Sequence, residues 1–479
     1  MQILLITIVI FMNHNQYVKC GSVVDLMYNK MSGIKDFFLD TYTAIRTRIN
    51  TVFHLGTGSH DSTSNNTKKQ SVTNIRLSSV LKRSNPLRVH SQPGVQTASP
   101  GEDIAHRPAH ILTTPQLAAT HGRIIETHVT YTLDGYILTL HRLRTNKVFD
   151  ETDYESKKRI ILLHHGLLGS SADWILLGPK KALPYILSDQ GHDVWMANAR
   201  GNYYSRAHIG LNLNSDEYWN FSWQEIGERD LPAILDYIRK TSNSTEPIDY
   251  IGHSMGATAL LVLLSVEHNY NRYIRIAFLL APLTFMAHTR GPMEMMAKIE
   301  ETALIKLLGT REFLPNRRTE VPAKYAELIS KLCNDLDIYC RNPLFFLAGS
   351  PMQEGTRTVE SADQLQEYAP AGGSSKTIIH YLMLIASKKF HHYKRPDWQF
   401  KLKYISTPML ILSSNDDLIS NATDNQMLYL SILNPLGHII IKDQNFSHTE
   451  FAWGFNADLL IYYKIRDLIE LGPDVITIQ

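Results

Sequence analysis

The chain has 479 residues, a formal net charge of +2 and a hydrophobic content of 44%. A chain of this length can form one large α/β core with additional segments, or two domains. The balanced charge and the apolar content exclude a disordered, fibrous or polyanion-binding protein, so no nucleic-acid partner is expected.

The N-terminus begins with an aliphatic run from Ile3 to Met12. Ten residues are too few to span a bilayer but match the core of a signal peptide, so no transmembrane segment is expected. Val18 and Cys20 supply the small side chains expected before cleavage at Gly21. The usual basic residues ahead of the core are missing, which leaves an uncleaved anchor or a missed start as alternatives. We predict a signal peptide over residues 1–20 and a secreted or lysosomal protein.

The remaining cysteines and the glycosylation signals agree with export. Cys20 would leave with the signal peptide, and Cys333 and Cys340 could then pair in an oxidising compartment. Five Asn-x-Ser/Thr sequons are present, at Asn65, Asn220, Asn243, Asn421 and Asn445. Sequons are common by chance, so they support secretion only weakly.

Residues 21–110 are predicted to form an N-terminal extension. Over residues 23–54 apolar side chains recur at a spacing of three to four, which is typical of one or two amphipathic helices. A helix packed on its own catalytic domain is favoured over a membrane-surface or partner helix, and both remain open. Residues 56–75 have the composition of a linker. The composition of a folded domain begins near residue 111.

From residue 111 onward, strand-like and helix-like segments alternate. Strands are predicted over Thr127–Tyr131, Ile137–Arg142, Arg159–Leu163, Asp193–Ala197, Asp249–Ile251, Ile274–Leu280, Pro408–Leu412 and Ile439–Ile441. Helical segments lie between most of them. This alternation predicts an α/β fold with a mostly parallel sheet and helices on both faces.

Residues 284–400 interrupt the alternation and are predicted to be an inserted helical cap or lid, which divides the core into residues 111–283 and 401–479. Four methionines lie near its start, at Met286, Met293, Met295 and Met296. Methionines usually fill a core, but a cap over an acyl-chain pocket would use the same flexible apolar side chains. Both interpretations stay open.

The motif Gly252–Gly256 reads Gly-His-Ser-Met-Gly and lies between a strand-like and a helix-like segment. Ile248–Ile251 is β-branched and aromatic, and Ala257–Leu264 is long and apolar enough for a buried helix. This context predicts a nucleophile elbow, in which Ser254 projects at the carboxyl end of a parallel strand. A turn into a buried helix without chemistry is the alternative for the motif alone.

A nucleophilic serine requires a base, a carboxylate that orients the base, and donors for the oxyanion. Asp417 follows the strand Pro408–Leu412, and His448 follows the strand Ile439–Ile441, so the order Ser254, Asp417, His448 is that of α/β-hydrolases. A lone histidine or aspartate in such a place is usually a loop or capping residue, but the ordered set predicts a serine hydrolase. An epoxide hydrolase or dehalogenase would need aspartate at position 254.

The turn His165-Gly166 after the strand Arg159–Leu163 predicts the oxyanion hole. In α/β-hydrolases a His-Gly turn at this place supplies one backbone amide. Leu167 would be that donor, and Met255, directly after the nucleophile, would be the other.

These residues carry a specific resemblance. From about Leu112 onward the chain is similar to the acid lipase family, which includes lysosomal acid lipase, gastric lipase and insect digestive lipases. The matching segments are Asp134–Arg142, His164–Trp174, Asp193–Trp195, Asn198–Asn202, Phe221–Gly227, Asp230–Ala233, the Gly252–Gly256 motif, Ala281-Pro282, Ala369–Gly373, His380 and His448.

The resemblance implies an α/β-hydrolase with a lid that cleaves triacylglycerols or cholesteryl esters at a lipid–water interface, as a monomer. It implies no metal and no organic cofactor. It also implies that Cys340 forms the family's lid-region disulfide with Cys333. The chain departs from the family in its N-terminal extension and in a compressed segment between Phe390 and Pro408. A catalytically slow lipid carrier on the same fold is the alternative function.

Two adjacent aspartates compete for the role beside His448. Side chains alternate where the chain leaves the strand Pro408–Leu412, so Asp416 and Asp417 must point to opposite sides. In acid lipases the triad aspartate lies nine positions after the opening proline and a further aspartate follows seven positions later, which matches Asp417 and Asp424. The sequence therefore favours Asp417.

Overall fold

The computed structural model describes residues 112–143, 158–314, 343–349, 365, 367–443 and 446–475, all within one compact unit. The predicted signal peptide, the N-terminal extension, Cys333 and Cys340 lie outside these residues.

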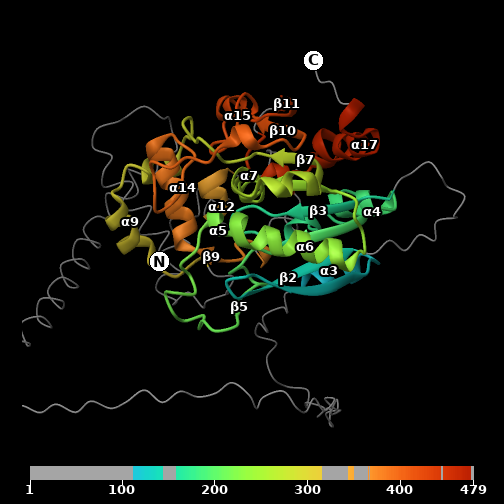
Figure 1. Ribbon diagram of the computed structural model, residues 1–479, viewed down its shortest axis with the longest axis horizontal. Helices are drawn as coiled ribbons and strands as arrows, with labels where there is room; N and C mark the ends of the chain where they lie inside the picture. Colours follow the sequence, from blue (N-terminus) through green and yellow to red (C-terminus); the bar gives the residue numbers. More distant parts are fainter. Residues whose placement is uncertain are drawn as a thin grey trace, which may run out of the picture. The chain divides into compact units, whose positions relative to one another are not determined.

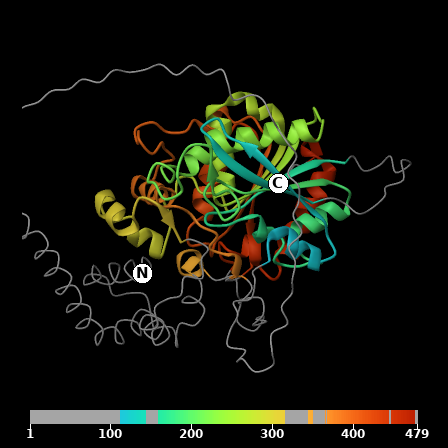
Figure 2. The same cartoon turned by 90° about the horizontal axis from the view of Figure 1, so that it is seen from below.

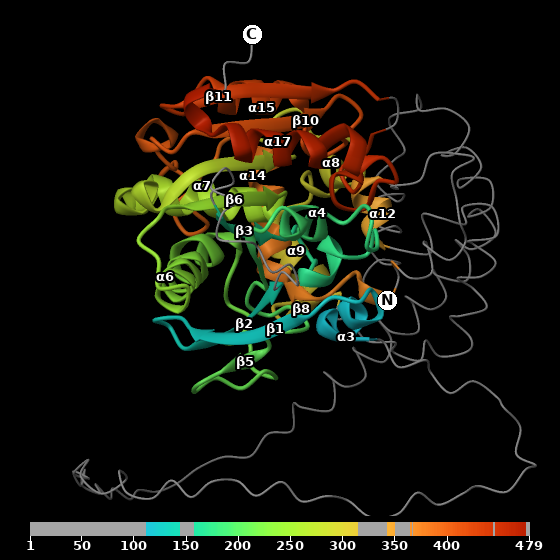
Figure 3. The same cartoon turned by 90° about the vertical axis from the view of Figure 1, so that its right-hand side faces the viewer.

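Nine of the described strands form one sheet with the order β1-β2-β4-β3-β6-β7-β10-β11, in which β5 also pairs with β2. Figure 3 shows β11 and β10 at the top, β6 and β3 in the middle, and β2, β1 and β5 at the bottom. The strands are β1 (Ile125–Tyr131), β2 (Tyr136–Leu143), β3 (Ile160–His164), β4 (Asp193–Ala197), β5 (Ala207–His208), β6 (Ile248–His253), β7 (Ile274–Leu280), β10 (Met409–Ser414) and β11 (Pro435–Ile441).

The sheet is antiparallel at one end and parallel elsewhere. β1 pairs antiparallel with β2, and β2 with β4. The pairs β4–β3, β3–β6, β6–β7, β7–β10 and β10–β11 are all parallel. The chain segments that follow these parallel strands therefore leave from one edge of the sheet, where side chains from distant parts of the sequence can meet.

Helices cover both faces of the sheet. One apolar cluster joins the sheet to α6 (Leu231–Thr241) and α7 (Met255–Val266), and a second joins it to α4 (Leu183–Asp189) and α17 (Tyr463–Leu471). The remaining core helices are α3 (Thr114–Thr120), α5 (Trp223–Glu225), α15 (Ala422–Tyr429), α16 (Glu450–Trp453), the 3-10 segments Ser171–Trp174, His268–Tyr273, Leu402–Tyr404 and Pro473–Val475, and the π-helical segments Ile226–Asp230 and Asp458–Tyr462. Among the described residues, no helix has the length and apolar character needed to cross a bilayer.

The predicted α/β fold is confirmed, and most strand boundaries agree within two residues. β11 is the main difference, because it begins at Pro435, four residues before the predicted Ile439. Proline and glycine at its start are typical of a loop. β11 lies at the edge of the described sheet, where a proline in the first position of a strand is tolerated.

The segment predicted as a cap contains α8 (Pro292–Met296), α9 (Glu301–Leu308), α12 (Pro343–Ala348) and α14 (Ser375–Ser387), with a two-stranded ribbon of β8 (Glu312–Phe313) and β9 (Gly373–Ser374). Figures 1 and 2 show the yellow α9 at the outer side of this unit, away from the central strands. Three of the four methionines, Met286, Met293 and Met296, are buried in the cluster that contains α7. In the structure these side chains fill a core.

Candidate active site

Ser254 lies in the sharp turn between β6 and α7. Its φ of 52° and ψ of −114° are unusual for a residue with a side chain and cost free energy. The flanking glycines leave no room for side chains. A Cβ on Gly252 would lie 2.7 Å from the Ala257 nitrogen, and one on Gly256 would lie 2.3 Å from the His164 carbonyl oxygen. The Gly-x-Ser-x-Gly pattern is therefore a packing requirement of this turn.

His448 connects Ser254 to Asp417 through its two ring nitrogens. Nε2 lies 2.8 Å from the Ser254 Oγ, and Nδ1 lies 2.7 Å from the Asp417 Oδ2. All three residues are buried. Because the carboxylate accepts the Nδ1 proton, Nε2 of the neutral ring is free to accept the serine hydroxyl. The order hydroxyl, imidazole, carboxylate is the one that removes a proton from a serine.

The two adjacent aspartates have different surroundings. Asp416 is exposed, whereas Asp417 is fully buried. The Oδ1 of Asp417 accepts the backbone amides of Ile419 and Ser420, each at 2.8 Å. These two amides fix the carboxylate, so that its other oxygen faces His448.

The turn after β3 lies against Ser254. A Cβ on Gly166 would be 3.2 Å from the Ser254 Cβ. Leu167 and Met255 directly follow these two residues, so their amides lie at the same turn. Met255 is also the first residue of α7, where an amide has no partner within the helix. Leu167 and Met255 thus come from two separate elements that meet at this turn.

Contacts from the predicted cap segment hold the loops of this site. Leu168 has a φ of 58°, and its carbonyl accepts the Ala371 amide at 2.6 Å. The Thr449 hydroxyl donates to the Gly349 carbonyl at 2.8 Å, next to His448.

The segment that leads into the cap is tied to the loop of Asp417. The carboxylate of Asp424 accepts the His288 amide at 2.9 Å and lies 2.8 Å from the His288 Nδ1. Arg290 donates to the Asn415 carbonyl at 2.9 Å. Asp424, the further aspartate of the family resemblance, therefore bridges the start of the cap segment and α15. Among the described residues it makes no hydrogen bond to His448.

His253, the second residue of the motif, makes contacts that sequence reasoning missed. Its Nε2 lies 3.1 Å from the His448 carbonyl oxygen, and a Cβ on Gly166 would be 2.9 Å from its Nδ1. Burial lowers the pKa of His253 well below 6.5, and the nearby His448 lowers it further. The neutral ring therefore links the elbow to the histidine loop. In the sequence, only the position of His253 inside the Gly252–Gly256 motif indicates its contact with the His448 loop.

The comparison with known proteins agrees with this geometry. A family model described as alpha/beta hydrolase fold matches residues 159–431, which is more than half of the chain. A second, described as partial alpha/beta-hydrolase lipase region, matches residues 114–178. Lipase 3 of Drosophila melanogaster is 31% identical over 72% of this chain and 89% of its own. The chain belongs to the α/β-hydrolase lipase family.

Two mammalian lipases are also similar to this chain. Gastric triacylglycerol lipase of Bos taurus is 28% identical over 76% of this chain and 93% of the relative. Lysosomal acid lipase/cholesteryl ester hydrolase of Homo sapiens is 28% identical over 78% of this chain and 94% of the relative. The predicted resemblance to acid lipases is confirmed, and the protein is a carboxylic ester hydrolase of the lipase type.

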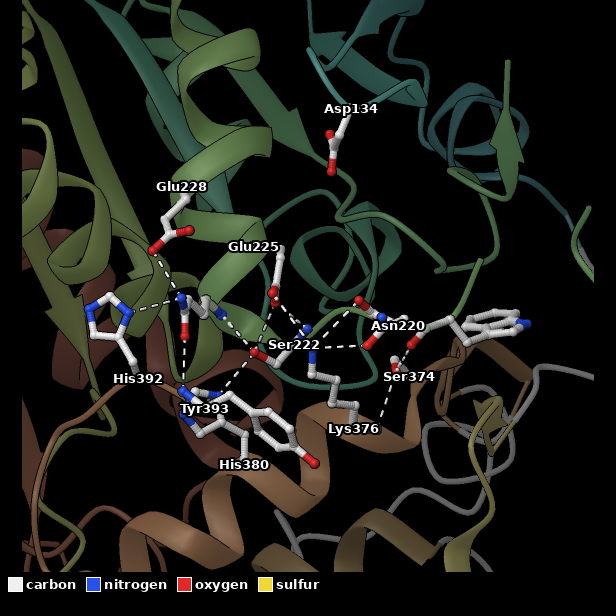
Figure 4. A network of polar contacts seen from close by, with 12 residues as sticks. Asp134, Asn220, Ser222, Glu225, Glu228, Ser374, Lys376, His380, His392 and Tyr393 are labelled. Carbon is white, nitrogen blue, oxygen red and sulfur yellow. Dashed lines mark hydrogen bonds and ion pairs between the residues drawn. The ribbon is translucent and has the colours of Figure 1, made fainter. Parts of the chain in front are cut away.

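His380, which also matched the family, lies in a second polar network between α14 and the core (Figure 4). Its ring stacks on Trp223 with centroids 3.8 Å apart. Nδ1 lies 3.0 Å from the Ser222 Oγ, and Nε2 lies 3.0 Å from the His391 carbonyl oxygen. Burial lowers the pKa of His380 well below 6.5. These contacts give His380 a role in packing α14 against the core of the lipase.

Lys376, one turn before His380, extends the same network to the segment before α5 (Figure 4). Its Nζ lies 3.2 Å from the Asn220 Oδ1 and 3.6 Å from the Glu225 Oε1. Ser374 donates its hydroxyl to the Trp219 carbonyl at 2.6 Å. The N-terminal end of α14 is therefore joined by polar contacts to residues 219–225 of the core.

Proposed function

We propose that this lipase hydrolyses long-chain acyl esters, either triacylglycerols or sterol esters, with Ser254 as nucleophile and His448 as base. The observation that carries the proposal is the unbroken chain of contacts from the Ser254 Oγ to His448 and on to Asp417, at 2.8 and 2.7 Å. The relatives named for these two substrate classes are matched over most of their length.

In the acylation step, His448 removes the Ser254 proton while Oγ attacks the ester carbonyl carbon. Asp417 stabilises the resulting imidazolium and keeps its ring in place. The amides of Leu167 and Met255 bind the oxyanion. His448 then gives the proton to the departing alcohol oxygen, which leaves an acyl ester on Ser254.

In the deacylation step, a water molecule takes the place of the alcohol. His448 removes a proton from the water as it attacks the acyl carbon. The C–O bond to Ser254 breaks, the serine recovers the proton from His448, and the fatty acid leaves. No metal or organic cofactor takes part in this sequence.

The substrate class is tested by measuring release of fatty acid from labelled triolein and from labelled cholesteryl oleate between pH 4 and 8. The proposal expects hydrolysis of at least one of them, and the ratio identifies the preferred ester. A purified, folded protein that binds both lipids and releases fatty acid from neither would support the lipid carrier instead.

We further propose that the lipase acts in the secretory pathway, as a secreted or lysosomal enzyme. Asn220 and Asn243 are exposed, as glycosylation sites must be. A disulfide between Cys333 and Cys340 is proposed on the family resemblance. Peptide mass mapping of the secreted protein without reduction tests the cleavage after Cys20 and the disulfide together.

The domain boundaries are also a proposal, with residues 21–110 outside the catalytic unit. Every residue of the candidate site lies in the compact unit that contains residues 111–479. A chain that begins at Ile111 behind a heterologous signal peptide should therefore be secreted and active. Complete insolubility of that chain would assign the extension to the catalytic core.

A further inference from the structure

His165 is a buried histidine beside the candidate oxyanion hole that the proposed mechanism does not use. It is 2% exposed, and its ring makes contacts through both nitrogens. Nδ1 lies 2.7 Å from the carbonyl oxygen of Gly166. The Ala199 amide lies 3.1 Å from Nε2, and the Asn202 Nδ2 lies 3.2 Å from the same atom.

The partners of His165 determine which nitrogen carries the proton. A backbone amide can only donate, so the Ala199 amide makes Nε2 an acceptor. Burial lowers the pKa of His165 to about 4, so the ring is neutral when a lipase assay is run above that pH. A neutral ring has one proton, which must then be on Nδ1. His165 therefore donates to the Gly166 carbonyl oxygen.

The Gly166 carbonyl belongs to the same peptide group as the Leu167 amide. A trans peptide is planar, and its C=O and N–H bonds point in opposite directions. The Gly166 oxygen accepts a second hydrogen bond from the Gly169 amide at 3.1 Å. Two donors on this oxygen fix the plane of the peptide and thus the direction of the Leu167 N–H. Within the described part of the chain, that N–H has no hydrogen-bond acceptor.

We propose that His165 is the positioning residue of the oxyanion hole. It holds the Gly166–Leu167 peptide plane so that the Leu167 amide is aimed before substrate arrives. The inference rests on the proposed function, because it concerns a donor of that same site. Oxyanion donors act by being oriented in advance, and the complete removal of one costs about 10²–10³ in kcat. Misorientation of the Leu167 amide is expected to cost about 10–100-fold.

Two substitutions separate this role from simple packing. In His165→Asn, the side-chain amide nitrogen takes the position of Nδ1 and can still donate to the Gly166 oxygen. In His165→Gln, the longer side chain reaches the position of Nε2 and can still meet Ala199 and Asn202, but the donor to Gly166 is lost. Packing alone favours His165→Gln, because its volume is closer to that of histidine.

The matched control is His164→Gln. His164 is the neighbouring residue and is fully buried, but its Nδ1 lies 2.9 Å from the Tyr250 hydroxyl. Among the described residues no hydrogen bond joins its ring to the Gly166 peptide, so this variant measures the cost of disturbing a buried histidine next to the turn. It should change stability and leave the oxyanion hole intact.

The experiment measures kcat, KM and the inhibition constant of a long-chain alkyl trifluoromethyl ketone for the full-length protein and the three variants. Serine adds to this ketone to give a tetrahedral oxyanion, so its affinity reports the oxyanion hole and not the ground state. We expect His165→Gln to lose about 10–100-fold in kcat and in ketone affinity, with KM within threefold. His165→Asn and His164→Gln should stay within about fivefold in both.

Equal ketone affinity in His165→Gln and the wild type would overturn the inference, and so would a greater loss in His165→Asn than in His165→Gln. If His165→Gln yields no folded protein, His165→Asn alone decides, because a folded His165→Asn with a loss above tenfold contradicts the role. A wild-type protein without esterase activity would refute the proposed function instead, so the two failures are distinguishable.

Discussion

This lipase has two clusters of serine, histidine and carboxylate, and only one has the order required for catalysis. In the first, His448 lies between Ser254 and Asp417, with one ring nitrogen for each. In the second, the Ser222 Oγ lies 3.0 Å from His380 and 3.1 Å from a carboxylate oxygen of Glu225. The residue types are nearly the same, but in the second cluster the serine is in the middle.

The two clusters differ in what the histidine nitrogen that faces away from the serine contacts. In His448 it donates to a carboxylate, which can stabilise an imidazolium. In His380 it donates to the neutral carbonyl of His391, and burial opposes a charge on the ring. The Ser222 hydroxyl also accepts the Gln224 amide and caps α5. Hydrogen-bond order, more than composition, therefore separates a nucleophile site from a packing site.

The largest expected effect separates the two serines. Ser254→Ala should fold normally and lose about 10⁴–10⁶-fold in kcat for a soluble long-chain ester, as removal of a nucleophile does in serine hydrolases. Ser222→Ala should keep kcat within a few-fold, because its hydroxyl only packs and caps. Equal losses in the two variants, measured on folded protein, would remove the distinction between the clusters.

The second prediction concerns the carboxylate of the first cluster. Asp417→Asn should lower kcat by about 10⁴-fold, because the amide cannot hold the ring in the required tautomer or stabilise its charge. Asp416→Asn is the control and should stay within a few-fold, since Asp416 is exposed. The reverse pattern in a steady-state assay would give Asp416 the orienting role.

The third prediction measures stability in the second cluster. Ser222→Ala should lower the free energy of unfolding by about 1–3 kcal/mol, because it removes a helix cap and the polar contact between the Ser222 hydroxyl and the buried His380 ring. Ser254→Ala should have a smaller effect, because alanine keeps the Cβ at this turn and removes only the contact of Oγ with His448. Urea denaturation at neutral pH, followed by tryptophan fluorescence, gives both values.

The smallest effect is a pH dependence of stability. The pKa of His380 is lowered in the folded protein. Below about pH 6.5 this ring therefore binds a proton in the unfolded chain but stays neutral in the folded one. Stability from this group is fully present above pH 6.5 and declines as the pH falls. In His380→Asn the decline should be shallower by up to about 1.4 kcal/mol per pH unit. Parallel curves for the variant and the wild type between pH 6.5 and 5 would show that His380 is accessible to protons.

The sheet and the meeting of Ser254, Asp417 and His448 at its parallel edge could be predicted because each depends on local patterns. The strand positions follow from apolar runs, and the elbow follows from two glycines whose Cβ atoms would clash. The alternation argument at residues 416 and 417 put the two side chains on opposite sides, and the structure has one exposed and one buried.

The roles of the other histidines could not be predicted, because their partners are distant in the sequence. His165 meets residues 199 and 202, and His380 meets residue 222. Nothing in the local pattern indicates that one buried ring fixes a peptide plane while another packs a helix. The sequence did not predict the start of β11, because the proline and glycine there are typical of a loop.

The role of Ser254 as nucleophile is tested most directly by labelling the purified lipase with a fluorophosphonate and locating the adduct by tandem mass spectrometry. Such a probe phosphonylates a serine only where a base and oriented oxyanion donors activate its hydroxyl. We predict one adduct in the wild-type protein, on Ser254, and none on Ser222. In Asp417→Asn the labelling of Ser254 should be strongly slowed. An adduct on Ser222, or an active enzyme that carries no adduct on Ser254, would contradict it.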